Sequence, residues 1–226
     1  MSEYQTGIET RSSIIDACRG LFYEKGFDKT TFVDICKAAS VNQGSIHYHF
    51  KNKENILRTI YEDTIKKNNA AAEAASPPGT LMYTKYFFGG EIYLYKMEAD
   101  EKFLRFNIDA SRLLNSANLS EFIFSQAQIL YFDEGFPSEP TALDCFETMA
   151  SLAFDNIVRL YVANNSYGLG YHQISELSIE IYRRILCIGD SDFQLIKEQL
   201  YALESSFPWE ALDTTLDSNR IFVEER

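Results

Sequence analysis

Two histidines separated by a single residue, His47 and His49, are the first residues that could do chemistry, because imidazole is a common metal ligand. On a helix, however, side chains two positions apart point roughly 200° away from one another, which places them poorly for a shared ion. The cysteines form no CxxC or other metal-like spacing. We therefore expect no metal and no cofactor, and we interpret all four cysteines as reduced packing residues: Cys18, Cys36, Cys145 and Cys187.

The one histidine in the second half of the chain, His172, gives no support for a catalytic site. It follows a Tyr-Gly-Leu-Gly-Tyr stretch, and no serine or cysteine motif beside it marks a nucleophile. Gly168 and Gly170 are too close together for a phosphate-binding fingerprint, and no strand pattern precedes them. The sequence therefore predicts no enzyme activity.

Residues that could contact nucleic acid gather at Asn42, Gln43, Gly44 and Ser45. If they begin a helix, free backbone N–H groups point outward there, and a glutamine side chain can pair with an adenine edge. Gly44 costs about 1 kcal/mol relative to alanine inside a helix, which suggests that another group approaches the backbone closely. Lys53 opens a further helix, where its ammonium group could hold a phosphate. The alternative is that these positions are simply solvated helix starts.

Helical periodicity and capping residues define the elements that must position these side chains. Thr6 and Glu9 make a predicted capping box for a first helix, from about Ile8 to Lys25. Gly26 follows, at the place where helices commonly end in a left-handed residue. A long helix is thus expected before the polar cluster.

Three more helices are predicted up to residue 75. Thr31 and Asp34 make a capping box for a two-turn helix, Asn42 is placed to cap a second short helix over 43–49, and Asn52 a longer one over 53–75. Two short helices joined by a tight turn form a helix-turn-helix, whose second helix enters the DNA major groove. The expected core of this unit is Ile35, Ala38, Ala39, Val41, Ile46, Phe50, Ile56 and Leu57, with Val33 also counted among the periodic residues of the first short helix.

The remainder of the chain also has helical periodicity, so the predicted fold class is all-α. Pro77-Pro78-Gly79 is the best boundary candidate, because two prolines cannot continue a helix. We divide the chain into a helix-turn-helix domain (1–52), a connecting helix (53–76) and a helical-bundle domain (77–226). Helices are expected over 81–98, 100–115, 118–132, 141–164, 172–188 and 190–206, followed by an irregular or partly disordered tail over 207–226.

The net charge of −12 is unevenly distributed over the 226 residues. Residues 1–75 contain ten basic and ten acidic side chains, whereas 76–226 contain eleven and twenty-three, so the whole imbalance lies in the second part. Within 25–58 six basic residues face three acidic ones. Because only the phosphates actually contacted drive counterion release, local positive charge is compatible with DNA binding.

No stretch approaches the ~20 continuous apolar residues that a membrane span needs, so we expect no membrane partner. The first residues also lack the basic flank and apolar run of a secretory signal. The cytoplasm is therefore the expected compartment.

The N-terminal motifs are specific as a set. Thr31-Phe32-Val33-Asp34-Ile35, Ala38-Ala39-Ser40-Val41, Gly44-Ser45-Ile46 and the run 49–57 (HFKNKENIL) together resemble the N-terminal domain of the tetracycline-repressor (TetR) family. The resemblance covers roughly residues 8–60. Three positions depart from the family pattern: Ser40 stands where the family has glycine, His47 where it usually has tyrosine, and Gln43 where a basic residue often follows the cap.

The resemblance implies a DNA-binding regulator whose third helix contacts the operator. It places His47 at a position that touches the DNA backbone and Tyr48 at one that reaches bases or phosphate. The expected DNA-binding set is Thr31, Asn42, Gln43, Gly44, Ser45, His47, Tyr48 and Lys53.

A ligand cavity is the second expected site. The second half is dense in aromatic residues, and a bundle this rich in large rings can leave a mostly apolar cavity, although core packing accounts for most of them. Asn107 and Asn156 interrupt apolar stripes, so each amide needs a partner from a neighbouring helix or from a ligand, and we favour the helix. The candidate effector-binding residues are Tyr86, Phe103, Phe106, Asn107 and Asn156.

The function that follows is a ligand-responsive regulator, more readily a repressor than an activator, that binds a palindromic double-stranded DNA operator as a homodimer. The helices 141–164, 172–188 and 190–206 are the candidates for the dimer interface, although the last has equal claim to pack on its own subunit. The effector is expected to be an apolar or aromatic small molecule. The alternative is a helical small-molecule-binding or protein-interaction module that recognises no specific operator.

Overall fold

The computed structural model describes residues 3–114, 158, 168–216 and 222, and all regular structure in them is helical. This confirms the all-α class. Of the predicted helices, 118–132 lies outside the described residues, as does 141–164 except for Val158. The elements are α1 (Glu3–Lys25), α2 (Phe32–Ala39), α3 (Gln43–Phe50), α4 (Lys53–Ala75), α5 (Met82–Ala99), α6 (Glu101–Leu114), α9 (Tyr171–Ile185), α10 (Asp190–Ser206) and the 3₁₀ turn η1 (Trp209–Ala211).

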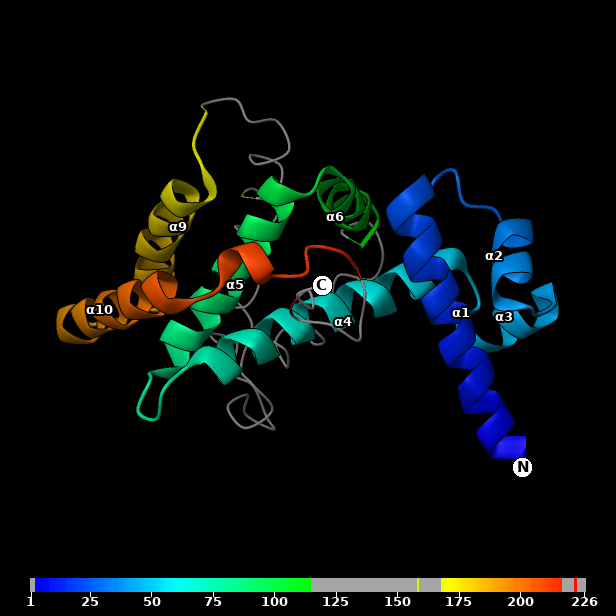
Figure 1. Cartoon of the computed structure of the whole chain (residues 1–226), viewed down its shortest axis with the longest axis horizontal. Helices are drawn as coiled ribbons and strands as arrows, with labels where there is room; N and C mark the ends of the chain where they lie inside the picture. Colours follow the sequence, from blue (N-terminus) through cyan, green and yellow to red (C-terminus); the bar gives the residue numbers. More distant parts are fainter. Residues whose placement is uncertain (1–2, 115–157, 159–167, 217–221, 223–226) are drawn as a thin grey trace.

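The helices form two groups joined by α4 (Figure 1). Helices α1, α2 and α3 lie together at one end, and α4 runs from them to the other end, where α5, α9 and α10 pack. Helix α6 lies between the groups and contacts both α1 and α4. None of the described helices is both long and apolar enough to cross a membrane.

Two hydrophobic clusters hold this arrangement together, and α4 contributes to both. The first joins α1, α2 and α3 to α4, α5 and α6, with Ile14, Ile46 and Phe103 each fully buried. The second joins the end of α4 to α5, α9 and α10, around Phe88 and Ile196. Pro77-Pro78-Gly79 lies in the turn between α4 and α5, which pack against one another. The domain limits at 52 and 76 stay predictions.

Three of the four predicted helix starts are confirmed by their hydrogen bonds. The Thr31 hydroxyl accepts from Asp34 N, Asn42 Oδ1 from Ser45 N, and Asn52 Oδ1 from Asn55 N. The start of the first helix was predicted wrongly, because α1 begins at Glu3 and Thr6 therefore lies inside it. The same residue types can occur in the first turns of a helix without capping it. Residue type alone therefore cannot distinguish such a pair from a real capping box.

Apart from η1, residues 207–216 are irregular, as predicted, but they are packed against the helices. Phe207, Leu212 and Leu216 are buried, and Leu216 O accepts a hydrogen bond from Arg19 on α1 at 3.4 Å. These apolar residues follow no helical or strand period, which is why the sequence predicted an irregular or partly disordered tail. The segment is irregular, but it is packed.

The cysteine prediction also needs a correction. Cys18 is fully buried, and burial raises the pKa of its thiol to about 12, which makes it an inert packing residue. Cys187 is exposed and adopts a positive φ of 51°, just after α9 ends. Because helix periodicity was extended to residue 188 while the helix ends at Ile185, Cys187 was wrongly placed on a packed face.

Candidate nucleic-acid interface and effector cavity

The turn between α2 and α3 sets the position of the third helix. Ser40 adopts the left-handed conformation (φ 55°, ψ 40°), and its N–H donates to Cys36 O to close α2. Ile35 on α2 and Ile46 on α3 are fully buried beneath the turn. Ser13 on α1 donates to Ala39 O at 3.1 Å, which ties the end of α2 to the first helix. The turn is therefore held by the buried core beneath it and by the hydrogen bond from α1.

Ala38, which was predicted as core, lies on the outer side of α2 instead, as does Val33. Ala38 is exposed, and Val33 has 76% of its surface exposed. A two-turn helix has room for only one narrow buried stripe, and Ile35 and Ala39, four positions apart, occupy it. The apolar side chain of Val33 is thus available on the outer surface.

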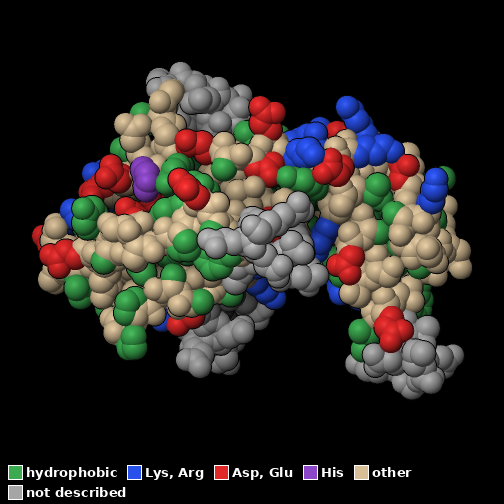
Figure 2. All heavy atoms as spheres, viewed as in Figure 1, with side chains coloured by type: hydrophobic (Ala, Val, Ile, Leu, Met, Phe, Trp, Pro, Cys, Tyr) green, Lys and Arg blue, Asp and Glu red, His purple; other side chains and the backbone are tan. Residues whose placement is uncertain are grey.

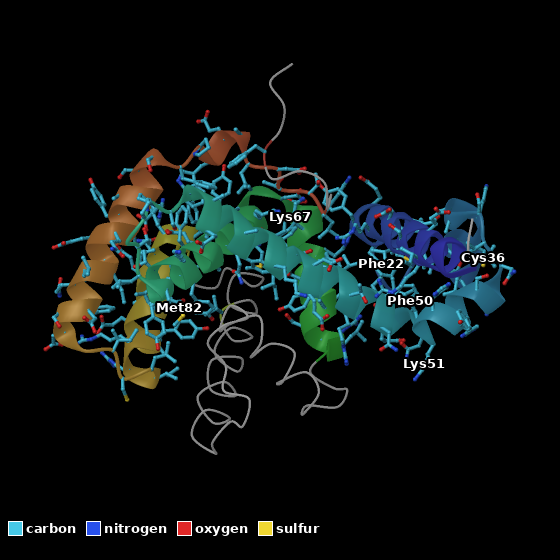
Figure 3. The ribbon with its side chains drawn as sticks, turned by 90° about the horizontal axis from the view of Figure 1, so that it is seen from below. Phe22, Cys36, Phe50, Lys51, Lys67 and Met82 are labelled. Atoms are coloured by element: carbon cyan, nitrogen blue, oxygen red, sulfur yellow. The ribbon has the colours of Figure 1, made fainter. Side chains whose placement is uncertain are left out.

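The start of α3 presents a polar and aromatic surface to solvent. Asn42, Gln43, Gly44 and His47 are exposed, and Tyr48 has 84% of its surface exposed. Lys51 follows at the end of the helix; Figure 3 places it at the outer edge, with Phe50 on the inner side. This surface has donors and acceptors at the helix start and a ring beyond them, which suits contacts with base edges and phosphates.

The presence of glycine at position 44 has an explanation within the protein itself. A Cβ at this position would come within 3.1 Å of Asn42 Oδ1, the oxygen that caps the helix. The glycine therefore leaves room for the cap, in addition to any close approach of a ligand to the backbone. A shallow groove beside it is lined by Asn42, which caps α3, by Ser45, Tyr48 and His49 from α3, and by Gly7 and Thr10 from α1.

The side chains of His47 and Thr31 make internal contacts. His47 Nδ1 lies 2.8 Å from Lys51 O, and its ring centre lies 5.3 Å from that of Phe32. The Thr31 hydroxyl donates to Asp34, whose carboxylate also pairs with Lys25 at 2.6 Å. Hydrogen bonds from Lys25 and then from Thr31 hold the pKa of Asp34 well below its usual range. Thr31 thus acts as a cap in the free protein.

Lys53 has a structural role that neither sequence interpretation included. Its Nζ donates to Phe27 O at 2.7 Å and Thr30 O at 2.8 Å, and it lies 4.1 Å from the ring centre of Phe27. An ammonium group has three N–H donors, so these bonds use two of them. Lys53 fastens the loop between α1 and α2 to the start of α4.

Helix α6 is attached to the end of α1 and the loop that follows. Lys102 pairs with Glu24 at 2.5 Å and Arg112 with Asp28 at 2.8 Å. The carboxylate of Asp109 accepts from Phe27 N at 3.2 Å. Figure 2 shows basic side chains gathered along this part of the surface. Movement of α6 would therefore act directly on the loop that Lys53 also holds.

A cavity of about 100 Å³ lies among α4, α5 and α9. Apolar groups form most of its wall, but the Asn68 amide faces it from α4, with Nδ2 buried and without a hydrogen-bond partner among the described residues. Burial and then the neighbouring carboxyl of Glu204 raise the pKa of Glu91 to about 9. The lining residues with described positions include Asn68, Tyr86, Phe87, Glu91, Ser175 and Tyr182.

Of the predicted effector-binding residues, Tyr86 alone is found among those that line this cavity. Phe103 and Phe106 are buried in the first hydrophobic cluster. Asn107 accepts a hydrogen bond from the Tyr93 hydroxyl and donates to Phe103 O, so its partner is a neighbouring helix. Asn156 lies outside the described residues. The sequence missed Asn68, although its place between Ile65 and Ala72, on an apolar face of the connecting helix, was a usable signal.

The N-terminal part matches a known family model. Residues 14–60 match the model described as bacterial regulatory proteins, tetR family. The chain is 34% identical over 73 residues to the probable HTH-type transcriptional regulator ArpR of Pseudomonas putida, which is 32% of this chain and 35% of that protein. It is 43% identical over 53 residues to IcaR of Staphylococcus epidermidis, the negative transcriptional regulator of the biofilm operon icaADBC, covering 24% of this chain and 29% of that one. The matches thus span about a third of the relatives' length.

Solved structures of regulators from this family are also similar. A TetR-family regulator from Streptomyces coelicolor A3 aligns with a TM-score of 0.47 and 19% identity, over 80% of this chain and 96% of that one. A TetR-family regulator from Pectobacterium atrosepticum aligns over 100% of both chains, with a TM-score of 0.43 and 18% identity.

Proposed function

We propose that this chain, which belongs to the TetR family, is a transcriptional repressor that binds a palindromic operator as a homodimer and releases it when a small molecule occupies the cavity. The observation that carries the proposal is the exposed start of α3, where Asn42, Gln43, Gly44 and Tyr48 face solvent above a buried core. A negative regulator among the N-terminal relatives favours repression. A DNA-binding role would further place the protein in the cytoplasm.

Base recognition is assigned to Gln43 and backbone contact to the residues around it. The amide of Gln43 is exposed and lies 3.3 Å from His47 Nε2, a weak contact that an adenine edge can replace. Replacing Gln43 with Ala should therefore change base preference at one position of each half-site, with a discrimination of about 1–3 kcal/mol. Selection of bound duplexes from a random pool measures this. Lys37→Ala, an exposed change on α2, is the matched control and should leave the preferred sequence unchanged.

The effector is proposed to be a small molecule with an apolar, ring-sized body and one hydrogen-bond acceptor. The cavity of about 100 Å³ has space for several waters or a small ring, and Asn68 Nδ2 offers a donor that has no partner among the described residues. A library of small aromatic amides and ketones can be tested by thermal shift. Asn68→Leu should abolish the response to acceptor-bearing compounds, whereas Asn107→Leu should lower stability and leave the selectivity among compounds unchanged.

Control of DNA binding is assigned to α6. The effector must favour one spacing of the two recognition helices over another, and the α6 contacts to Glu24, Phe27 and Asp28 offer a direct route. Charge reversal at Lys102 (Lys102→Glu) should weaken the coupling between effector and DNA without removing either binding event. Titration of operator DNA with and without effector measures this coupling.

The dimer interface is proposed on α9 and the outer side of α10. Leu177 and Ile181 on α9 are 56% and 38% exposed, and Leu195 and Tyr201 on α10 are 42% and 73% exposed. The heptad-like residues of α10, from Phe193 to Leu203, pack inside their own subunit instead. Leu177→Glu with Ile181→Glu should dissociate the dimer and weaken operator binding together, as light scattering and DNA titration on one sample can test. A native chain that is monomeric at micromolar concentration would contradict the two-fold mechanism.

A further inference from the structure

Three side chains that are far apart in the sequence meet where α5, α9 and α10 come together. Glu91 lies on α5, His172 in the first turn of α9 and Glu204 in the last turn of α10. One potential metal-ligating atom from each lies within 4.8 Å of the others. His172 Nδ1 is 2.9 Å from Glu91 Oε1. One imidazole and two carboxylates therefore converge from three helices.

The buried member of the group is incompletely satisfied. Glu91 is 1% exposed, and its second carboxylate oxygen, Oε2, has no hydrogen-bond partner of normal geometry among the described residues. A buried carboxylate oxygen without a donor is costly. The neighbouring Glu204 and Glu176 are themselves acidic, and the carboxyl of Glu204 is close enough to share a proton with Glu91. A cation at this point would satisfy the oxygen and offset the negative charge.

We propose that Glu91, His172 and Glu204 bind a divalent transition-metal ion, with Zn²⁺ as the best match to one imidazole and two carboxylates. Ligand atoms at about 2.0–2.2 Å from a tetrahedral ion are roughly 3.4 Å apart, so the contact between His172 and Glu91 needs to widen by only a few tenths of an ångström. A fourth position would stay open for water or another ligand. Mg²⁺ and Ca²⁺ prefer oxygen donors throughout and fit this set less well.

The site would link α5 and α9, which line the cavity, to α10, which packs in the second hydrophobic cluster. Glu91 lines the cavity as well, so the ion would stand at one of its walls. The ring of His172 is held by Tyr171, with centres 4.1 Å apart, and faces Trp209 at 6.3 Å. Figure 2 shows a histidine over α9 with acidic side chains on either side of it. The proposal is independent of DNA binding, because no residue of α1–α3 takes part.

Calorimetric titration of the chelator-treated full chain with ZnCl₂ tests this site. We expect one saturable site per chain, together with a rise in the midpoint of thermal unfolding when Zn²⁺ is added. Cys187→Ser serves as the background, because this exposed thiol is an alternative ligand. His172→Ala and Glu204→Gln should each weaken Zn²⁺ binding at least tenfold. His172 is about half exposed, so its replacement leaves the fold intact, which circular dichroism checks.

Glu176→Gln is the matched control, since it removes an exposed charge from α9 without removing a ligand. It should change Zn²⁺ affinity by no more than about threefold, and MgCl₂ should give no comparable binding to any variant. Absence of saturable binding in the native chain would overturn the proposal. So would unchanged affinity in His172→Ala, or loss of binding on replacing Cys187 alone.

Discussion

The N-terminal helices and the C-terminal bundle satisfy their polar groups in different ways. At the start of α2, α3 and α4 the capping side chain and its partner are three residues apart. In the bundle, Gln199 on α10 accepts from Leu81 and Thr84 across more than a hundred residues. Local bonds form wherever the short motif occurs, whereas distant bonds depend on the whole bundle being assembled. The recognition surface is thus set locally, and the effector region is set by packing.

Both regions leave buried polar atoms without a hydrogen-bond partner among the described residues, but only in the bundle do such atoms lie at a cavity. Arg19 Nε is the example on α1, and Asn68 Nδ2 and Glu91 Oε2 are the examples at the cavity. The ammonium of Lys96 is also buried in the bundle, beside the Phe103 ring at 4.9 Å. Groups of this kind lower the free energy of unfolding unless a ligand satisfies them. We infer that the bundle keeps unfavourable polar burial where it binds ligands, and the following changes test that difference.

The largest effect is expected at Lys96. Burial, reinforced by Lys67, lowers its pKa to about 8, and each unit corresponds to about 1.4 kcal/mol. Lys96→Met should therefore raise the free energy of unfolding by about 3 kcal/mol at pH 7. Between pH 8 and about 10.4 the unfolded lysine stays protonated while the folded one is neutral, so native stability rises with pH and the advantage of the variant shrinks. Urea unfolding at pH 7 and pH 10 measures this; an advantage that is constant with pH would contradict it.

Lys53 comes next, and with Ser13 and Arg19 it shows that the N-terminal helices also use hydrogen bonds between distant residues. It fastens a loop more than twenty residues away through two charge-assisted hydrogen bonds. Lys53→Met should lower the free energy of unfolding by about 2 kcal/mol and weaken all DNA binding, because the loop loses its anchor. Lys51→Met, an exposed neighbour, is the control and should leave stability unchanged. If Lys53→Met kept full stability and only reduced the salt dependence of DNA binding, phosphate contact would be its main role.

A smaller effect is expected from the caps. Asn42→Ala should lower the free energy of unfolding by about 1 kcal/mol, because Ser45 N loses its acceptor. Asn52→Ala removes the equivalent cap from α4 and should cost about the same. The two variants should differ in operator affinity, with Asn42→Ala the weaker binder, since only α3 is assigned to the groove. Equal loss of affinity in both would remove the special role of α3.

The smallest effect concerns the turn. Ser40→Gly should raise the free energy of unfolding by roughly 0.5–1 kcal/mol, because the left-handed conformation strains any residue with a Cβ. Ser12→Gly, in the regular part of α1, should lower it by a similar amount. Thermal unfolding of the pair measures the opposite signs. Destabilisation by both would mean that the Ser40 side chain contributes a contact of its own.

The contrast between local and distant hydrogen bonds also explains which features could be predicted from the sequence. Thr31 with Asp34, Asn42 and Asn52 were predictable as caps because each signal lies within four residues. The role of Lys53 was not, since its acceptors, Phe27 O and Thr30 O, are backbone atoms that no motif marks. The exposure of Val33 was not predictable either, because a two-turn helix can bury only a few of its apolar residues and the sequence does not mark which ones.

In the bundle, helix positions were predictable but partners were not. The limits of α10 match the predicted 190–206, because its apolar period is regular. Which side chains would meet across helices was hidden, as the group of Glu91, His172 and Glu204 illustrates. Phe103 and Phe106 were predicted to line a cavity, yet aromatic content alone cannot distinguish a cavity wall from a core.

The central claim is that α3 reads a specific operator. Selection of bound duplexes from a random pool by the full chain, repeated with Tyr48→Ala, tests it most directly. We predict convergence on a palindrome, with affinity for that duplex falling at least tenfold in Tyr48→Ala, while Met82→Ala, a change at an exposed apolar side chain on α5, binds as the native chain does. A pool that fails to converge, or a Tyr48→Ala variant that binds the selected duplex as tightly as the native chain, would contradict the account.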